Sequence, residues 1–360
     1  MATAPAHATN GYFANGYGAP SKAMAGAGVA VGEGPLAPAQ NPALGVEVGN
    51  VAGLCFTGFM PHRYTDSTNT NMVGGRVESN NEFFPIVCGG VNYMLSDDTS
   101  LGLVMYGNGG MNTEYDTNVF AKFNDNPTVT GESTPLGVDL AQAFFALNGA
   151  HKVTPTLSVG AAPVLAVQRF KAYGLEPFFG SSDFADKLTN NGYDWSYGGG
   201  FKLGANWDAT NWLRFGVNYQ SRMWMTPFDK YKGLFAEGGD FDIPSTIGEA
   251  IAIKPHKDLV LTVEHQRIFY EDVASISNSH VNGGQYLHLG SDQGAGFGWK
   301  DMDIFRIAAQ YKATDALTLR TGFSYATKFT DDQEVLFNIL APATIRTHVG
   351  VGATYKFNEV

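Results

Sequence analysis

Basic side chains and long apolar runs are both scarce in this 360-residue sequence. Lys and Arg number 23 against 34 Asp and Glu, so the formal net charge is -11, and charged residues make up only 16% of the chain. Nucleic-acid binding requires a basic surface, so the acidic balance argues against a nucleic-acid partner. A membrane-spanning helix requires about 18 or more consecutive apolar residues, and the sequence contains no such run.

The residue patterns of enzymes and metal sites are missing as well. The eight His residues are scattered, without an H-x-x-x-H or H-E-x-x-H spacing, and there is no G-x-S-x-G nucleophile motif. The pairs Asp97-Asp98 and Asp331-Asp332 are more typical of solvated turns than of paired catalytic carboxylates. The glycine-rich runs 107–110 and 198–200 precede no helical pattern, which disfavours phosphate-binding loops. We therefore expect no enzymatic activity, no cofactor and no metal site.

Long alternating segments are what the sequence does contain. In the segment 195–207 the odd positions form one apolar face that begins with Trp195 and ends with Trp207, while the even positions are small or polar. A strand tilted near 40° would place the two Trp roughly 30 Å apart across a membrane, as in the aromatic girdles of a membrane barrel. The alternative is a half-buried strand of a soluble sandwich, but such strands are usually about half as long.

Twelve such segments follow one another, and their connections alternate strictly between short polar turns and long loops. All short turns would therefore lie at one end, as in an up-and-down barrel. We predict an all-β fold, a transmembrane antiparallel up-and-down β-barrel. Its expected strands are 46–60, 82–95, 99–115, 139–153, 156–173, 194–207, 213–225, 242–254, 259–270, 303–312, 317–327 and 344–357.

The N-terminal stretch differs from the rest of the chain. Residues 10–44 are rich in Gly and Ala and carry only two formal charges, Lys22 and Glu33. The stretch has too little apolar bulk for a core of its own, yet it lacks the composition of a disordered tail. We therefore interpret residues 1–44 as a plug, or hatch, inside a barrel of residues 45–360. Ala6-His7-Ala8 fits a signal-peptidase site or is a chance match, and we interpret residues 1–8 as a residual leader.

Several motifs, in this order, resemble one known family. They are Gly16-x-Gly18, Ser21-Lys22-Ala23-Met24-Ala25-Gly26-Ala27-Gly28, Asn41-Pro42-Ala43, Gly298-Trp299-Lys300-Asp301, Leu319-Arg320-Thr321-Gly322-Phe323-Ser324-Tyr325 and Phe337-Asn338-Ile339-Leu340-Ala341-Pro342. Together they are similar to the FadL/TodX-type transporters of long-chain fatty acids and hydrocarbons in Gram-negative outer membranes. The resemblance covers nearly the whole chain. That family has fourteen strands, so either this barrel is smaller or two C-terminal strands are absent from this chain.

The hatch assignment leads to expectations for individual residues. Gly26 and Gly28 should sit where a side chain would strike the barrel wall. Asn41, Pro42 and Ala43 should cap the periplasmic end of the hatch, immediately before the first strand.

The segment 99–115 is interrupted by Gly107, Asn108, Gly109 and Gly110 at membrane depth. Glycines inside a strand mark a bulge or bend, and Asn tolerates the positive φ that we expect such a bend to need. One interpretation is a bulge that merely shapes the wall. The resemblance favours another, in which this strand kinks inward and leaves a lateral opening.

Two long loops carry bulky apolar side chains that are unusual at an exposed surface. They are Phe178, Phe179, Phe184 and Leu188 in the loop 174–193, and Trp224, Met225, Phe228, Leu234 and Phe235 in the loop 224–237. Apolar clusters of this size usually bind something. The resemblance implies a groove between these loops that takes up substrate first. Alternatively the loops pack on each other as a lid, and both interpretations can hold.

Basic residues on the inward faces of the strands allow three interpretations. These residues are Lys202, Arg214, Arg222, Arg306, Arg320 and Arg346. They could line a polar porin for anions, pair with Asp or Glu, or hold a fatty carboxylate.

The two cysteines, Cys55 and Cys88, fall on neighbouring strands. They could form a disulfide in the oxidising cell envelope, but we expect two small buried thiols instead.

These observations and the resemblance together predict a transport protein of the bacterial outer membrane. We expect passive uptake of hydrophobic small molecules, with long-chain fatty acids as cargo, through the loop groove, a lumen pocket near the hatch and a lateral exit. Monoaromatic or alkane hydrocarbons are the alternative cargo, and a general polar porin is the alternative function. The expected partners are the substrate and the lipid and lipopolysaccharide of the outer membrane, and we expect a monomer.

Overall fold

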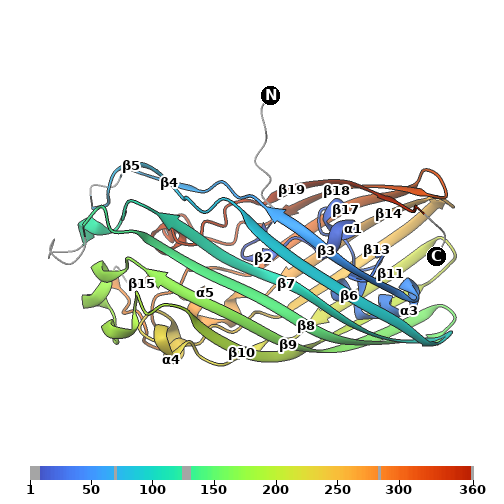
Figure 1. The fold of residues 1–360 in the computed structure, drawn as a ribbon, viewed down its shortest axis with the longest axis horizontal. Coiled ribbons are helices and arrows are strands. Elements are labelled where there is room, and N and C mark those ends of the chain that lie inside the picture. The colour runs from blue at the N-terminus through green and yellow to red at the C-terminus, as the bar shows by residue number, and fades with distance from the viewer. Residues whose placement is uncertain (1–8, 69–70, 124–130, 283–284, 358–360) are drawn as a thin grey trace.

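Twelve long strands form the wall of the molecule in the part of the chain that the computed structural model describes, residues 9–68, 71–123, 131–282 and 285–357. Each strand pairs antiparallel with the next, which confirms the predicted up-and-down barrel (Figure 1). Ala6-His7-Ala8 lies outside the described residues. The strands are β3 (Val51–Phe59), β6 (Phe84–Ser96), β7 (Thr99–Tyr115), β8 (Leu136–Thr154), β9 (Leu157–Tyr173), β10 (Asp194–Asp208), β11 (Leu213–Gln220), β13 (Thr246–His256), β14 (Leu259–Ile268), β17 (Met302–Lys312), β18 (Leu317–Ala326) and β19 (Thr347–Tyr355).

The remaining elements are short and lie inside the barrel or in its long loops. The short strands are β1 (Thr9–Asn10), β2 (Phe13–Ala14), β4 (Tyr64–Ser67), β5 (Gly75–Glu78), β12 (Trp224–Met225), β15 (Val281–Asn282) and β16 (Gln285–Tyr286). The α-helices are α1 (Gly18–Ala23), α2 (Ala37–Gln40), α3 (Gly45–Val48), α4 (Ala236–Gly239), α5 (Ala274–Ser277) and α6 (Val335–Asn338). The 3-10 turns are η1 (Pro42–Leu44), η2 (Ala121–Phe123), η3 (Glu176–Ser181), η4 (Ala185–Lys187), η5 (Asp229–Tyr231) and η6 (Tyr270–Asp272). None of the described helices combines the length and apolar character needed to cross a bilayer.

The outward faces of the strands are apolar, as the alternation predicts. Trp195 and Trp207 at the two ends of β10 are each 50% exposed, whereas Lys202 between them is buried on the inner face. β10 pairs without interruption with β9, from Asp194 opposite Phe170 to Trp207 opposite Leu157. The short connections gather at one end of the barrel and the long loops at the other, which we call the short-turn end and the long-loop end (Figure 1).

Most expected strands differ from the observed ones by one to four residues at an end, and two depart further because the chain leaves the regular wall. The first starts at Val51 rather than at residue 46, because residues 45–48 form helix α3. The segment 213–225 is divided, since β11 ends at Gln220 and Met223 pairs with Ile243 before β12 returns to β10. In both places the chain turns inward, so regular pairing along the wall stops.

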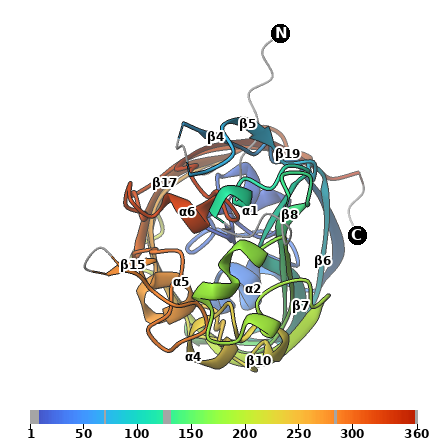
Figure 2. The same ribbon diagram turned by 90° about the vertical axis from the view of Figure 1, so that its left-hand side faces the viewer.

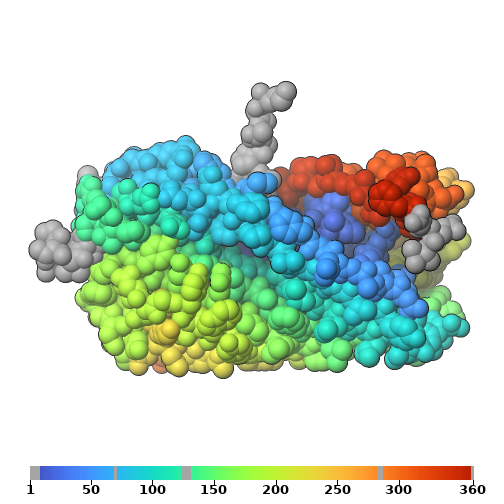
Figure 3. Space-filling model, in the orientation of Figure 1, coloured from blue at the N-terminus to red at the C-terminus, as the bar shows by residue number. Residues whose placement is uncertain are grey.

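β3 and β19 stand at the two ends of the sheet, and no backbone pairing joins them within the described ranges. Outward side chains on these two strands are highly exposed, with Leu54 89% and Val351 78% exposed. Figure 3 shows the dark blue N-terminal residues between the red strands and the lighter blue β3. The wall is therefore a curled sheet with a seam.

Cys55 on β3 and Cys88 on β6 form a disulfide, so the expectation of two free thiols is wrong. The two residues lie directly opposite each other in the β3–β6 register, with 5.0 Å between their Cα atoms. That separation lies in the range that a disulfide requires. The bond therefore ties the end strand β3 to its neighbour.

The N-terminal segment, residues 9–44, lies inside the ring of strands (Figure 2). Most of its residues are buried, including Met24, Ala27, Ala30 and Ala39, which are each at most 1% exposed. Its first residues form a small hairpin, in which β1 pairs with β2. The segment therefore fills space that the wall encloses.

Candidate functional site

The N-terminal segment rests against glycines of the wall. A Cβ atom added at Gly160 or Gly322 would overlap with the backbone of Pro42 or Met24 of the segment, and one added at Gly204 would overlap with the Asn41 side chain. Glycine lets the two backbones approach more closely than any other residue would. The segment is therefore fitted to this wall by backbone contact.

Gly26 and Gly28, the two glycines singled out in the segment itself, differ from each other. A Cβ at Gly26 would overlap with Asn15 and lie 2.9 Å from Nε of Arg306 on β17. A Cβ at Gly28 would first meet Gln40 of the same segment, at 2.9 Å, so the expected clash with the wall is wrong there. The backbone amide of Gly28 instead reaches the wall by donating to Glu264 Oε1 on β14 at 2.8 Å.

Asn41, Pro42 and Ala43 form a fully buried turn just before α3. The Asn41 side chain accepts a hydrogen bond from the Ala43 amide at 3.0 Å, which caps η1, and donates to the carbonyl of Val29 at 2.7 Å. The Pro42 carbonyl accepts a hydrogen bond from the Asn148 side chain on β8 at 3.2 Å. The turn thus connects the backbone at Val29 with η1 inside the N-terminal segment, and it connects both to strand β8 of the wall.

Strand β7 loses one of its two neighbours at Gly107–Gly110. Its pairing with β6 stops at Met105 opposite Gly89, whereas its pairing with β8 continues to Tyr115. The β7–β8 register shifts between Gly107 and Gly109, so a bulge is present. None of these four residues has a positive φ, so the expected left-handed backbone is wrong.

The N-terminal hairpin approaches β7 at this bulge. Phe13 pairs with Gly109, and the Gly110 amide donates to the Tyr12 carbonyl at 3.0 Å. A Cβ at Gly109 would overlap with that same carbonyl, so glycine is needed here for close approach rather than for φ. The hairpin therefore satisfies backbone groups that the missing β6 pairing would otherwise leave open.

Asn108 begins a buried row of side-chain amides that crosses four strands. It accepts from the Tyr17 hydroxyl at 3.1 Å and donates to Gln142 at 3.0 Å. Gln142 donates to Gln168 at 3.0 Å, and Gln168 donates to Ser196 at 3.2 Å. Sequence reasoning missed this row, although a polar residue at an inward position of each of four successive strands was the available signal. The row therefore links β7, β8, β9 and β10 on the inner face, beside the part of β7 that no longer pairs with β6.

The two apolar loops pack on each other, and they divide the predicted groove residues into two sets. Phe178, Leu188, Met225, Phe228, Leu234 and Phe235 are at most 8% exposed, whereas Phe179, Phe184 and Trp224 remain 38 to 58% exposed. The Gly233 amide donates to the Lys187 carbonyl at 3.1 Å, and Ser182 Oγ donates to the Gly233 carbonyl at 2.7 Å. Six of the nine residues are therefore buried inside the long-loop end. Three of these six, Phe178, Leu234 and Phe235, line a cavity there.

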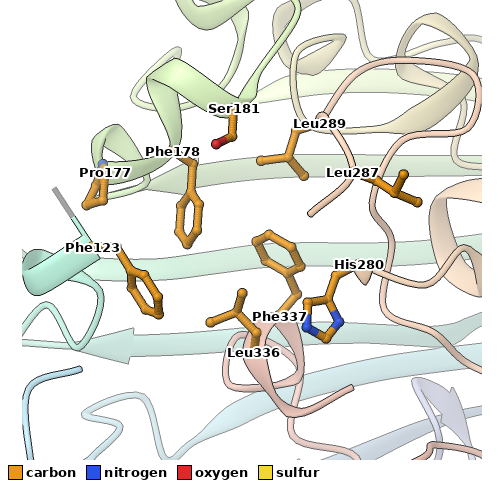
Figure 4. Close-up of a pocket in the computed structure, with 9 residues that line it drawn as sticks. All are labelled: Phe123, Pro177, Phe178, Ser181, His280, Leu287, Leu289, Leu336 and Phe337. Carbon is orange, nitrogen blue, oxygen red and sulfur yellow. The ribbon is translucent and has the colours of Figure 1, made fainter. Parts of the chain in front are cut away.

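Two small apolar cavities lie among these loops. The first, which we call the loop cavity, has a volume of about 100 Å³ and is lined by Phe123, Pro177, Phe178, Ser181, His280, Leu287, Leu289, Leu336 and Phe337 (Figure 4). The second, the wall cavity, has about 20 Å³ and is lined by Val138, Phe170, Leu234, Phe235, Ser275, Leu289, Ala295, Gly296, Phe297, Phe337 and Leu340. Sequence reasoning found Phe178, Leu234 and Phe235 but missed the loop 271–301 and α6. The run Phe337-Asn338-Ile339-Leu340 inside a long loop was the signal for α6.

The inward basic residues mostly have partners. Arg214 pairs with Asp208 and Glu47, Arg222 pairs with Asp242 and Asp240, and Arg320 pairs with Glu33. Arg306 donates to Gln266 at 2.7 Å. Arg346 precedes β19, and its guanidinium lies 5.6 Å from the ring centroid of the outward-facing Tyr325. These residues do not form a continuous basic lining.

Lys202 lies on the inner face of β10 and contacts the N-terminal segment. Its ammonium group is buried, donates to the carbonyl of Ala39 and to the Tyr106 hydroxyl, and lies 5.5 and 5.6 Å from the ring centroids of Tyr17 and Tyr106. Among the described residues, no carboxylate lies within ion-pair distance of Lys202. The buried Lys202 nitrogen thus contacts carbonyl, hydroxyl and aromatic groups within the described ranges.

Charged groups also hold the loop 221–245 at the long-loop end. Arg222 Nε lies 2.6 Å from Asp242, and its Nη2 lies 3.4 Å from Asp240. Burial and the neighbouring Asp242 raise the pKa of Asp240 to about 6, against the opposing effect of Arg222. Two carboxylates of this loop therefore share one guanidinium.

The profile of a family described as "Outer membrane protein transport protein (OMPP1/FadL/TodX)" matches residues 1–360. The chain belongs to this family. Solved structures with the same fold include the Pseudomonas putida toluene transporter TodX, which is 19% identical with a TM-score of 0.72 over 97% of this chain and 91% of that one. The Ralstonia pickettii toluene transporter TbuX is 20% identical, with a TM-score of 0.66 over 96% and 90%. A Pseudomonas aeruginosa FadL homologue is 15% identical, with a TM-score of 0.66 over 98% and 88%.

A curated relative matches more closely but over a short stretch. It is a "47 kDa outer membrane protein" of Pasteurella multocida (strain Pm70), 41% identical over 59 residues, which span 16% of this chain and 13% of that protein. Family membership places the chain in the bacterial outer membrane, in a family that transports hydrophobic compounds. Members of this family act as transport channels.

Proposed function

We propose that this protein takes up hydrophobic small molecules passively, from the long-loop end, and releases them sideways between β6 and β7. The observation that carries the proposal is the end of β6–β7 pairing at Met105, below a loop region that encloses two apolar cavities. The N-terminal segment acts as the hatch, because it fills the lumen between the loops and the short-turn end.

The cavities supply the favourable surface that a water-filled pore cannot offer to an apolar solute. Ser181 and His280 are the polar members of the loop cavity, and Ser275 is the polar side chain of the wall cavity. Each CH₂ group moved from water into such a lining gains about 0.8 kcal/mol. Long-chain and aromatic molecules are therefore favoured over sugars or ions.

The lateral exit follows from what covers the break in the wall. Above Met105 the gap beside β7 is bordered by Ile86 of β6 and by the hairpin residues Tyr12 and Phe13. Movement of this hairpin would open a path from the lumen into the membrane. A solute that leaves there enters lipid directly and avoids the cost of crossing water.

Two cargo classes are each favoured by a different observation. The cavities have no Lys or Arg in their linings, which favours uncharged aromatic or alkane molecules. Lys202 deeper in the lumen, without an acidic partner among the described residues, favours a fatty acid whose carboxylate could replace the Ala39 carbonyl as its partner. Uptake of labelled toluene and labelled hexadecanoate, each with and without Lys202→Met, distinguishes them: only fatty-acid uptake should depend on Lys202.

A removable cross-link across the gap tests the route. A Cβ atom at Gly107 would lie 3.2 Å from Cγ2 of Ile86, so cysteines at these two positions are close enough to bridge. The native cysteines are first changed to Ser, and Gly107→Cys with Ile86→Cys is then compared in its oxidised and reduced forms. We expect hydrophobic uptake to stop on oxidation and to return on reduction. Equal uptake in both forms would show that the route runs along the barrel axis instead.

The expected assembly and surroundings remain part of the proposal. We propose a monomer that works alone within outer-membrane lipid and lipopolysaccharide, since the hatch, the cavities and the gap all come from one chain. Light scattering of the detergent-solubilised protein measures its mass, and a dimer or trimer would contradict this part of the proposal.

A further inference from the structure

The segment 334–340 between β18 and β19 folds back into the barrel mouth as a strap, and hydrogen bonds to the Asn338 side chain and to two backbone carbonyls anchor it from two sides. On one side the Trp299 indole donates to Asn338 Oδ1 at 2.6 Å, and Asn338 Nδ2 donates to the Phe297 carbonyl at 2.7 Å. On the other side two hydroxyls of β7 donate to strap carbonyls at 2.9 Å, Thr113 to Leu340 and Tyr115 to Ile339. The strap therefore spans from the loop 271–301 to β7.

A third anchor fixes the start of the strap at Glu334. Its carboxylate is buried and accepts from the Ser279 hydroxyl at 2.5 Å, and it lies 2.6 Å from Nδ1 of His280. Burial opposes ionisation, but these hydrogen bonds outweigh it and hold the pKa of the Glu334 carboxyl below its usual value. Both ends of α6 are thus held by polar contacts.

Phe337 lies between these anchors and is held only by apolar packing. Its ring lies 5.4 Å from the ring of Phe178 and 6.2 Å from that of His280, measured between centroids. Figure 4 shows Phe337 at the centre of the loop-cavity lining, facing Phe178 and Leu289. Since none of the strap's hydrogen bonds involves this ring, the ring can turn while the backbone stays in place.

Phe337 also borders both cavities, and Leu289 is the other side chain that does so. The loop cavity has about 100 Å³ and the wall cavity about 20 Å³. An apolar protein cavity that binds benzene measures about 150 Å³. Neither cavity alone reaches that size, so a benzene-sized solute needs the space that the Phe337 ring divides.

We propose that Phe337 is the size gate of the uptake path, which separates the loop cavity from the wall cavity and sets how bulky a molecule can pass. This inference rests on the proposed transport function and adds its size-selecting residue. The anchors keep the strap in place, so selection depends on the volume of one side chain. A smaller residue at 337 should join the cavities, and a larger one should narrow the passage.

The test compares uptake of toluene and biphenyl by wild type and by Phe337→Ala, Phe337→Leu and Phe337→Trp. We expect the biphenyl-to-toluene uptake ratio to rise at least fivefold in Phe337→Ala, to rise less in Phe337→Leu, and to fall at least threefold in Phe337→Trp. Val335→Ala, on the same helix but with a side chain 58% exposed, is the matched control and should keep the wild-type ratio. An unchanged ratio across the three Phe337 variants would overturn the gate.

A second measurement does not depend on transport. Crystals of wild type and of Phe337→Leu, which is the milder change for folding, are soaked with bromobenzene, and the bromine positions are located by anomalous scattering. We expect no bound bromine in either cavity of wild type, because neither is large enough alone, and bound bromine in the joined cavities of the variant. Identical bromine positions in the two proteins would overturn the gate even if uptake occurs. If wild type takes up neither solute but bromine binds in the variant alone, the result would contradict the transport function and still support the division of the two cavities by Phe337.

Discussion

The two halves of the barrel interior are filled in opposite ways. Toward the short-turn end, small residues of the N-terminal segment lie against wall glycines such as Gly160 and Gly322, backbone against backbone. Toward the long-loop end, aromatic rings pack on one another, with centroids 4.8 Å apart for Phe170 and Phe235 and 4.9 Å apart for Trp299 and Phe329. Backbone contact leaves no side chain to move aside, whereas packed rings can turn and leave small cavities. Under the proposed function, we therefore expect the short-turn half to seal the lumen and the long-loop half to select the solute.

Substitution of a wall glycine should have the largest effect, because it breaks the seal directly. A side chain at Gly160 would overlap with the backbone of Pro42, so Gly160→Leu should displace the N-terminal segment. Single-channel conductance should rise by about an order of magnitude. Gly180→Leu in η3 is the control, since a Cβ there meets nothing within 4 Å. A conductance equal to wild type in Gly160→Leu would mean that this segment is not the seal.

Truncating an aromatic residue at the other end should cost stability without causing a leak. Phe228 is fully buried against Phe170 and Phe235, with ring centroids 5.7 and 5.8 Å away. Phe228→Ala should lower the free energy of unfolding by about 3–5 kcal/mol, as for other buried aromatic truncations. Denaturant unfolding in detergent measures this loss, and conductance should stay at the wild-type level. A leak in this variant would show that the aromatic half also seals the lumen.

The alternation of apolar and polar residues was enough to predict the wall, because the side-chain period of a strand is local information. Strand β7 was predicted with its observed bounds, 99–115. The contents of the long-loop end were predicted less well, since the burial of Phe228 and the position of Phe337 beside both cavities depend on which loops meet in space. Gly28 shows the same limit, because the sequence marks a close approach but not the partner that approaches. The disulfide depends on the β3–β6 register that places Cys55 opposite Cys88, and residue alternation alone does not specify that register.

Loss of the Asn41 side chain should have an intermediate effect on the short-turn half. Its amide joins the Val29 carbonyl and the Ala43 amide, both inside the N-terminal segment. Asn41→Ala leaves these buried groups without partners and should lower stability by about 1–3 kcal/mol. Hydrogen exchange should quicken in residues 29–44 and remain unchanged in the aromatic loops. Faster exchange in both regions would contradict the division of the interior into two independent halves.

The smallest expected effect is a pH dependence confined to the long-loop half. Burial and Asp242 raise the pKa of Asp240 to about 6 from an ordinary value of 3.8, so the folded protein holds this proton where the unfolded chain has released it. The stabilising contribution is therefore complete below about pH 4 and is lost as the pH rises through 6. Asp240→Asn removes the titration, so its thermal unfolding midpoint should fall less than that of wild type between pH 4 and pH 7. The comparison uses the difference between the two proteins, because carboxylates distant from Asp240 titrate equally in both. Parallel pH profiles for the two would show that Arg222 already neutralises Asp240 in the folded state. The stability of the long-loop half would then be as independent of this titration as that of the short-turn half.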